Sequence, residues 1–283
     1  MSDKINAIII GATGAVGREL VEYLLMNDNY GKITIFVRRV IDRWEKLPEE
    51  KKKKLNIIKI ENLDFMSESK EKIQSILNDN TTQYHVLFNV LGSRVGRGEE
   101  EFRKVDFTYV VNSCILCEKL NIGHFSNCSA ANASANSWFL YSRVKGQAED
   151  ECLKKNVNYI SILRPGIILN RDNDDRLGEK IIAYVPFLPK ITSKDIAMSM
   201  LVDDLEYPIS SKPNELKIKL DKFIPHFNEI KPAERRFFNL LSDKQRNNSF
   251  ILKHKNLAPN KNKELENERK RAKTIKDNCY DEK

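Results

Sequence analysis

The sequence predicts an α/β fold, a doubly wound parallel sheet with helices on both of its faces. Three observations favour this fold. Short β-branched apolar runs alternate with amphipathic helical stretches over residues 1–166. The run Ile8-Ile9-Ile10 ends at a glycine-rich turn, after which a helical pattern begins at once. The run from His85 to Leu91 is apolar almost throughout, which is typical of a strand buried on both faces.

The elements follow in a regular order along the chain. The first expected strand ends at Ile10. The other five cover Lys32–Val37, Leu55–Ile60, His85–Leu91, Phe125–Ser129 and Tyr159–Leu163. The first expected helix begins at Arg18. The others cover Glu71–Leu77 (capped by Ser67), Glu99–Leu120, Trp138–Lys155, Leu177–Tyr184 and a segment from Thr192 or Ser193 to Leu205. Strands and helices that alternate in this way form right-handed crossovers, and ligands then bind beyond the carboxyl ends of the strands.

The turn after the first strand has the composition of a phosphate-binding loop. Its members are Gly11, Ala12, Thr13, Gly14, Ala15, Val16 and Gly17. Gly11 can adopt the turn conformation, Gly14 lets the backbone approach a pyrophosphate, and Gly17 allows close packing of helix and strand. The spacing is G-x-x-G-x-x-G rather than G-x-G-x-x-G, and an ordinary strand-to-helix turn is the alternative. Its position at the start of the sheet favours dinucleotide binding.

The residues at the ends of the second and third strands indicate which dinucleotide binds. NAD-selective domains carry an acidic residue at the end of the second strand, but here Arg38 and Arg39 take that place. A guanidinium pairs well with a phosphate, so the sequence favours NADP(H) over NAD(H). Asp64 and Phe65 follow the third strand, where Asp64 can accept from the exocyclic amine of an adenine. A helix-capping role for Asp64 is the alternative.

A second motif lies on the helix after the fifth strand. Tyr141 and Lys145 are four positions apart and therefore share one helix face. Lys145 can hold the nicotinamide ribose, and its charge favours ionisation of the Tyr141 phenol, which can then exchange a proton with a carbonyl substrate. Ser129 ends the preceding strand, and its hydroxyl can fix the carbonyl oxygen. An exposed helix turn is the alternative for an isolated Tyr-x-x-x-Lys, but the three motifs occur in order on one sheet.

The basic charge is concentrated in the last part of the chain. The formal net charge is +8, and residues 226–283 carry 15 Lys and Arg against 9 Asp and Glu. We therefore divide the chain into an NADP-binding Rossmann domain (1–166), a small lid on the substrate side that completes this domain (167–225), and a Lys/Asn-rich tail that is disordered or marginally helical (226–283). Because the body is nearly neutral, we do not expect direct binding to nucleic acid. The tail is the candidate surface for protein partners.

Apolar runs and cysteine content indicate the cellular location of the protein. No apolar run approaches the length of a membrane span, and the first strand begins too early to leave room for a signal peptide. Five scattered cysteines, an odd number, fit a reducing compartment better than a disulfide scaffold. The sequence therefore predicts a cytoplasmic protein, with the nucleus as a second location, and a monomer or homodimer without a transmembrane segment.

Together these motifs give the sequence a recognisable family likeness. The segments that carry it are Gly11–Gly17, Val37–Arg39, Phe102–Asp106, Phe139–Gly146 and Leu163–Gly166. Over about residues 5–225 the sequence resembles the atypical, extended-type short-chain dehydrogenases/reductases, and among them the Tat-interacting protein oxidoreductase family. Dehydrogenases of this superfamily usually carry an Asn on the long middle helix. This sequence has Asp106 at the corresponding position, with Asn112 further along.

The resemblance implies a set of functional residues and two classes of function. It implies NADP(H) contacts from the glycine turn, Arg38, Arg39, Asp64, Leu91, Gly92, Ser129, Tyr141, Lys145 and Pro165 to Ile168, with Tyr141 as proton donor and acceptor. The first class is an NADP(H)-dependent oxidoreductase acting on an unidentified carbonyl or alcohol. The second is an NADPH-binding regulator or adaptor in transcription, nuclear import or cell survival with little turnover, for which a nuclear import receptor is an implied partner.

Other suggestive features favour structural roles. Cys114 and Cys117 form a C-x-x-C, but they lie in an apolar helix without a second ligand pair, so we expect no metal site. His85 and His124 precede strands, where local hydrogen bonding is the more common role. The basic run Glu268–Lys273 fits nuclear import or an acidic partner, although a solvated surface is the more common outcome.

Overall fold

The computed structural model describes residues 4–79, 81–169, 190–206 and 253–256, and it confirms the predicted α/β fold. The strands of the main sheet are β1 Ile5–Ile10, β2 Tyr30–Val37, β3 Leu55–Lys59, β4 Val86–Asn89, β5 His124–Cys128, β6 Tyr159–Leu163 and β9 Lys253–Asn256. Their order is β3-β2-β1-β4-β5-β6-β9. The first six are parallel, and β9 pairs antiparallel with β6. The chain therefore reverses its direction of winding at β1, between β2 and β4.

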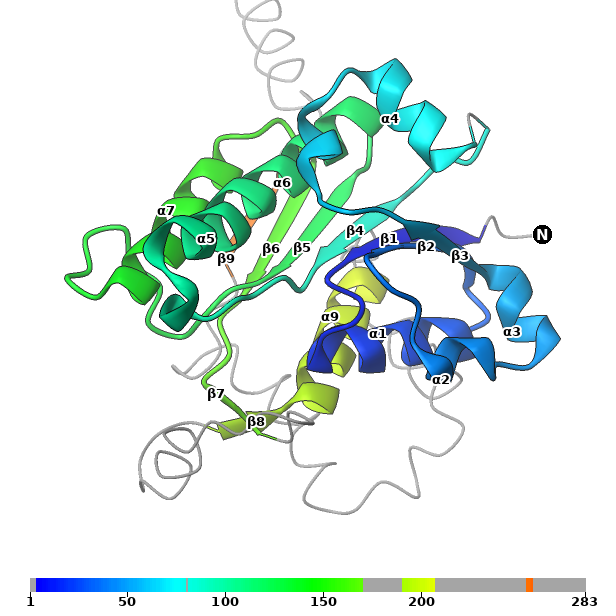
Figure 1. Ribbon diagram of the computed structural model, residues 1–283, viewed down its shortest axis with the longest axis horizontal. Coiled ribbons are helices and arrows are strands. Elements are labelled where there is room, and N and C mark those ends of the chain that lie inside the picture. Colours follow the sequence, from blue (N-terminus) through cyan, green and yellow to red (C-terminus); the bar gives the residue numbers. More distant parts are fainter. Residues whose placement is uncertain (1–3, 80, 170–189, 207–252, 257–283) are drawn as a thin grey trace, which may run out of the picture.

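Helices cover both faces of this sheet (Figure 1). On one face lie α1 Ala15–Met26, α2 Asp42–Glu45, α3 Glu49–Lys54 and α9 Ser193–Glu206. On the other lie α4 Lys70–Leu77, α5 Glu99–Arg103, α6 Tyr109–Leu120 and α7 Leu140–Leu153. Two short strands, β7 Ile167–Leu169 and β8 Lys190–Thr192, pair in parallel beside the main sheet. None of the helices in the described ranges combines the length and apolar character that a membrane crossing requires.

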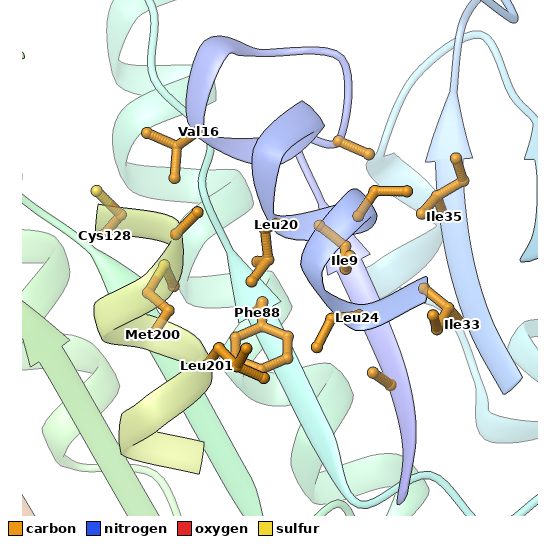
Figure 2. Packing of buried hydrophobic residues seen from close by; sticks show 14 of the residues in the cluster. Ile9, Val16, Leu20, Leu24, Ile33, Ile35, Phe88, Cys128, Met200 and Leu201 are labelled. Atoms are coloured by element: carbon orange, nitrogen blue, oxygen red, sulfur yellow. The ribbon is translucent and has the colours of Figure 1, made fainter. Parts of the chain in front are cut away.

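Each face of the sheet has its own apolar core, because successive residues of a strand point to opposite faces. On the α1 side, Leu20 and Leu24 pack with Phe88 of β4 and with Met200 and Leu201 of α9 (Figure 2). On the other side the core contains residues of β1, β4, β5 and β6 together with α4, α6 and α7. The two cores explain why the strands read as continuous apolar runs.

Helix α9 belongs to the core of the Rossmann domain. It packs against α1 and buries Ile196 and Ala197 completely. Thr192 caps it, since Thr192 Oγ1 accepts from the backbone N–H of Asp195 while the Asp195 carboxylate accepts from the backbone N–H of Thr192. The remaining parts of the predicted lid, including the helix expected over 177–184, lie outside the described residues. A lid over the pocket therefore stays a prediction.

Two expectations need correction. The helix expected over 99–120 is not uniform, because a π-helical turn, Lys104–Thr108, separates α5 from α6. The cap of α4 is Ser69 rather than Ser67, since Ser69 Oγ accepts from the backbone N–H of Lys72. Of the predicted tail, only 253–256 is described, and these residues form β9. Disorder in the rest of 226–283 stays a prediction.

Candidate functional site

The predicted site residues gather at one edge of the sheet. Gly11 follows β1, Gly92 follows β4, Ser129 follows β5 and Pro165 follows β6, and these four strands are neighbours. Because the strands are parallel, their carboxyl ends meet at the same edge. Arg38 follows β2 at this edge as well. The fold thus brings together residues that are far apart in the sequence.

The glycine turn leaves no room for side chains at two of its positions. Gly11 has a φ of +92°, and a Cβ there would lie 2.9 Å from the backbone carbonyl of Val90. A Cβ at Gly17 would lie 2.3 Å from the Gly11 carbonyl oxygen. At Gly14 a Cβ would meet only this oxygen, at 3.3 Å. Gly11 and Gly17 are therefore required by the fold of the turn, whereas Gly14 leaves open space at the N-terminus of α1.

The other residues of this turn divide by burial. The side chains of Ala12 and Val16 are buried, and Val16 packs in the core beside α9 (Figure 2). Their backbone alone can face a ligand. Thr13 is exposed and Ala15 is half-buried. The backbone N–H groups that begin α1 lie in this turn, and such groups attract anions through the helix dipole.

Arg38 and Arg39 are both exposed immediately after β2. In the described part of the chain neither guanidinium is paired with a carboxylate. The Asp64 carboxylate forms an ion pair with Lys104 Nζ at 3.2 Å. Phe65 is buried, and its ring packs 4.8 Å from that of Phe36. A ligand near this edge therefore meets free positive charge at β2, whereas the Phe65 side chain belongs to the core.

The remaining predicted contacts lie at the ends of β4 and β6. Leu91 is half-buried and Gly92 exposed in the loop after β4. Pro165 is buried after β6, and its carbonyl accepts from the backbone N–H of Ala131 at 2.9 Å. Ile168 is half-buried in β7 and packs against the core on the α1 side. All four border the edge where the glycine turn lies.

These features fit a dinucleotide. The turn excludes side chains at Gly11 and Gly17, the start of α1 offers backbone N–H groups, and two exposed guanidiniums follow β2. A diphosphate group suits the first two of these features.

Tyr141 and Lys145 lie one turn apart at the beginning of α7. The Tyr141 ring stacks on Phe102, with centroids 5.8 Å apart, and remains 42% exposed. Lys145 Nζ lies 2.8 Å from Asp106 Oδ1, and both side chains are buried. Burial disfavours the charged ammonium, but the Asp106 carboxylate and the Tyr141 hydroxyl outweigh this effect and raise the pKa of Lys145 above its usual value. The site therefore holds a buried ammonium one helical turn from a solvent-accessible phenol.

Ser129 takes part in a buried polar network. Its hydroxyl donates to Glu149 Oε1 at 2.5 Å, and Arg164 Nε donates to the same oxygen at 2.9 Å. Glu149 is fully buried in α7, one turn after Lys145. The Ser129 proton is therefore directed toward Glu149, so the hydroxyl can approach a ligand as an acceptor. It can donate to a carbonyl oxygen only if the bond to Glu149 breaks.

Three of these charged partners were not predicted from the sequence as parts of the site. Glu149 and Arg164 form an ion pair beside Ser129, and Asp106 pairs with Lys145. Glu149 follows Lys145 by four positions, which places both on one helix face, and this spacing was the available signal. Arg164 lies in the Leu163–Gly166 segment. Its pairing with Glu149 depends on how α7 packs against the end of β6.

Of the features expected to have structural roles, the cysteines and His124 lie in described parts of the chain, whereas Glu268–Lys273 lies outside the described residues. Cys114, Cys117 and Cys152 are buried between α6 and α7, and burial raises the pKa of the Cys117 thiol. The ring of His124 is buried among polar groups at the amino-terminal edge of the sheet. No group of three or more metal-binding side chains occurs within the described ranges.

A family model described as NAD(P)H-binding matches residues 11–201. The chain belongs to the NAD(P)H-binding family. This match begins at the first glycine of the turn and ends in α9, so it covers the Rossmann sheet and the helix that completes its core. A nicotinamide cofactor is therefore the ligand class of this site.

Two relatives place the chain more closely within the NAD(P)H-binding family. Protein HTATIP2 of Rattus norvegicus is 30% identical over 176 residues, which are 62% of this chain and 67% of the relative. Protein FMP52-2, mitochondrial, of Scheffersomyces stipitis is 30% identical over 183 residues, 64% of this chain and 74% of the relative. The chain is an atypical short-chain dehydrogenase/reductase close to HTATIP2, as the resemblance predicted.

Solved structures agree on the fold. The UDP-N-acetylglucosamine 4-epimerase of Methanobrevibacter ruminantium M1 has a TM-score of 0.53 at 16% identity, over 72% of this chain and 74% of that one. The UDP-glucose 4-epimerase of Thermotoga maritima has a TM-score of 0.52 at 13% identity, over 70% of this chain and 73% of that one. At these identities the likeness extends to the fold alone.

The expected location is wrong. The sequence predicted a cytoplasmic and also nuclear protein, but the FMP52 relatives from Scheffersomyces stipitis, Aspergillus niger and Candida albicans are named as mitochondrial. The prediction relied on the lack of a recognisable signal peptide or membrane span. Such a lack does not identify a compartment.

Proposed function

We propose that the protein is an NADP(H)-dependent oxidoreductase that acts on a carbonyl or alcohol substrate through Tyr141 and Lys145. One observation carries this proposal. An accessible phenol and a buried ammonium share one face of α7 at the sheet edge that also bears the glycine turn. This pairing suits a proton donor held next to a bound nicotinamide.

In the proposed reaction the protein binds and orients the reactants and moves one proton. When bound, NADPH supplies the hydride that reduces the carbonyl carbon. The Tyr141 hydroxyl gives its proton to the carbonyl oxygen and regains one from water, to which its ring is open. The Lys145 charge stabilises the phenolate that forms in between. In the reverse direction the phenolate accepts the proton of the alcohol.

Two exposed aromatic residues that precede Tyr141 in the sequence favour an apolar substrate. Trp138 and Phe139 precede α7 and are 96% and 78% exposed. Their backbone is held firmly, since the Arg143 guanidinium donates to the carbonyl of Trp138 at 2.9 Å. A Cβ at Gly146 would lie 2.2 Å from the loop backbone, so the loop packs directly on α7. Exposed aromatic rings on a fixed backbone suit an aromatic or aliphatic aldehyde or ketone.

Replacing Tyr141 with phenylalanine should abolish carbonyl reduction and leave NADPH binding intact. General acid catalysis contributes about 10²–10⁴-fold to a rate, and the loss of kcat should fall in this range. NADPH consumption with a panel of aromatic and aliphatic aldehydes measures the effect. Tyr84→Phe is the matched control, because Tyr84 precedes β4 at the opposite edge of the sheet. Equal activity of Tyr141→Phe and the wild type would refute the proposed role.

Cofactor choice is tested at the end of β2. The variants Arg38→Ala and Arg39→Ala should each weaken NADPH binding by roughly 10- to 100-fold, since a hydrogen bond to a charged group contributes about 1.5–3 kcal/mol. NADH lacks the 2′-phosphate, so its affinity should hardly change in the same variants. Titration of both nucleotides by fluorescence provides the measurement. A wild-type preference for NADH, or equal losses for both nucleotides, would overturn the NADP(H) assignment.

The Ser129 contact favours a second function, that of an NADPH-binding regulator with little turnover. Because its proton is directed to Glu149, the hydroxyl is not free to polarise a carbonyl. In that case the wild type and Tyr141→Phe would bind NADPH equally, and no substrate in the panel would give turnover above background. Protein partners, which the basic segment 226–283 would recruit, belong to this second proposal.

A further inference from the structure

Asp106 is a fully buried carboxylate that the proposed chemistry does not use. It lies in the π-helical turn Lys104–Thr108, inside the helix that otherwise runs from Glu99 to Leu120. Single π-helical turns within α-helices occur frequently at functional sites, because they displace the helix face locally. Here the displaced residue reaches both α7 and the loop after β4.

The two oxygens of this carboxylate have different partners. Oδ1 lies 2.8 Å from Lys145 Nζ. Oδ2 accepts two hydrogen bonds from Ser93, one from the backbone N–H at 2.8 Å and one from the hydroxyl at 2.6 Å. One side chain thus connects the middle helix, α7 and the loop that follows β4. This loop borders the glycine turn, since Gly11 packs on the backbone of Val90.

The surroundings of the Lys145 ammonium contain few ionisable groups. The ionisable groups that face its ammonium are Asp106 from the π-helical turn, Tyr141 from α7 itself and the Cys128 thiol from β5. Of these groups, Asp106 is the only carboxylic acid, and it is also the one in direct contact with the ammonium, with Oδ1 2.8 Å from Nζ. A buried ammonium without such a partner loses its proton readily, because burial disfavours the charged form.

We propose that Asp106 is a positioning residue of this site, whose carboxylate keeps the buried Lys145 ammonium charged and ties it to the loop after β4. Asp106 itself touches neither the phenol of Tyr141 nor the start of α1 in any described contact. It acts through Lys145 and Ser93. That a bound nucleotide contacts the Lys145 charge rests on the proposed function. The effect of Asp106 on this charge does not depend on the proposed function.

The ionisation of Lys145 can be followed directly in the full-length protein without nucleotide. NMR of lysines labelled with ¹³C at Cε gives a titration midpoint, and the signal missing in Lys145→Arg identifies Lys145. Asp106→Asn preserves the size of the side chain and should lower the midpoint by about one unit or more. Ser93→Ala removes one partner of Asp106 but no charge, and it should leave the midpoint almost unchanged. An unchanged midpoint in Asp106→Asn, or an equal shift in both variants, would overturn the proposal.

Stability provides a second measurement if Asp106→Asn folds poorly. Asp106→Asn and Lys145→Met each leave one buried charge without its partner, so each should lower the melting temperature. The double variant removes both charges and should regain at least half of the loss of either single variant. Losses that add up in the double variant would show that the two groups do not depend on each other.

Nucleotide binding separates this inference from the proposed function. Between pH 7 and 9.5 the wild type should keep nearly constant NADPH affinity, whereas the affinity of Asp106→Asn should fall by about twofold or more as Lys145 is deprotonated. A parallel pH dependence in both proteins would count against the role of Asp106. If the wild type bound no NADPH at any pH, the proposed function would fail, and the lysine titration would still decide the role of Asp106.

Discussion

Replacing Gly17 with alanine is expected to lower the free energy of unfolding by at least about 2–3 kcal/mol and to abolish nucleotide binding. The added methyl group would lie 2.3 Å from the carbonyl oxygen of Gly11 and 2.7 Å from Cα of Ala12. Both neighbours are backbone atoms, so relief requires α1 to move away from the turn. Leu20 and Leu24 of α1 fill the core against Phe88 (Figure 2), and this packing opposes such a movement.

Gly14→Ala is the matched control, because it adds the same methyl group three residues earlier. Gly14 has an ordinary φ of −71°, and the new Cβ would lie 3.3 Å from a single oxygen. We expect a loss of less than about 1 kcal/mol in stability. Its nucleotide affinity should nevertheless fall by roughly tenfold or more, since the methyl group occupies the space open to a pyrophosphate.

Urea unfolding and NADPH titration of both variants therefore separate folding from binding. The expected pattern is a folded Gly14→Ala protein with weak binding and a destabilised Gly17→Ala protein. If Gly17→Ala were as stable as the wild type, the close approach of α1 to the turn would not exist. If Gly14→Ala bound NADPH normally, the diphosphate would not lie at the start of α1.

The sheet could be predicted from the sequence because its strands are buried on both faces. Such strands appear as continuous apolar runs, and Tyr159–Leu163 agrees with β6 at both ends. The strand β9 could not be found in this way. Its residues, Lys253–Asn256, are polar, and they join the sheet only by pairing with the edge of β6. The local pattern contains no trace of such a distant pairing.

The parts of the candidate site that could be predicted are the motifs that directly follow a strand or share a helix face. Tyr141 and Lys145 share a helix face by their spacing alone, and the glycine turn follows the first strand directly. The partner of Lys145 could not be predicted, since a π-helical turn displaces Asp106 from its place on a regular helix. The bond from Ser129 to Glu149 likewise depends on how α7 packs against β5. These contacts depend on three-dimensional packing, which cannot be derived from the hydrophobic periodicity of the sequence.

A buried charged cluster at the opposite edge of the sheet makes stability depend on pH. His124 Nδ1 lies 2.8 Å from Asp204 Oδ1, and its Nε2 lies 3.1 Å from Ser161 Oγ and 3.4 Å from Asp203 Oδ2. The Tyr30 hydroxyl donates to the other oxygen of Asp204. Helix α9 supplies both carboxylates, so the cluster fastens α9 to β2, β5 and β6. This contact anchors the helix that covers one core of the molecule.

The free energy of unfolding is expected to fall between pH 6.5 and pH 9. Burial opposes protonation of the His124 ring, but the adjacent Asp203 and Asp204 carboxylates outweigh burial and raise its pKa from 6.5 to about 9. A raised pKa in the folded state stabilises the protein fully below the unfolded value of 6.5, and this gain disappears as the pH rises through 9. The shift corresponds to a loss on the order of 3 kcal/mol over this range.

Urea unfolding at pH 6, 7.5 and 9 provides the measurement, with His124→Gln as the comparison. Glutamine can hydrogen-bond to Asp204 but carries no proton that titrates in this range, so its stability should be lower at pH 6 and change little up to pH 9. Burial also raises the pKa of Tyr30 well above its usual value, but that phenol titrates only above this range. A wild-type stability that stays level or rises between pH 6.5 and 9 would mean that His124 is neutral in the folded protein.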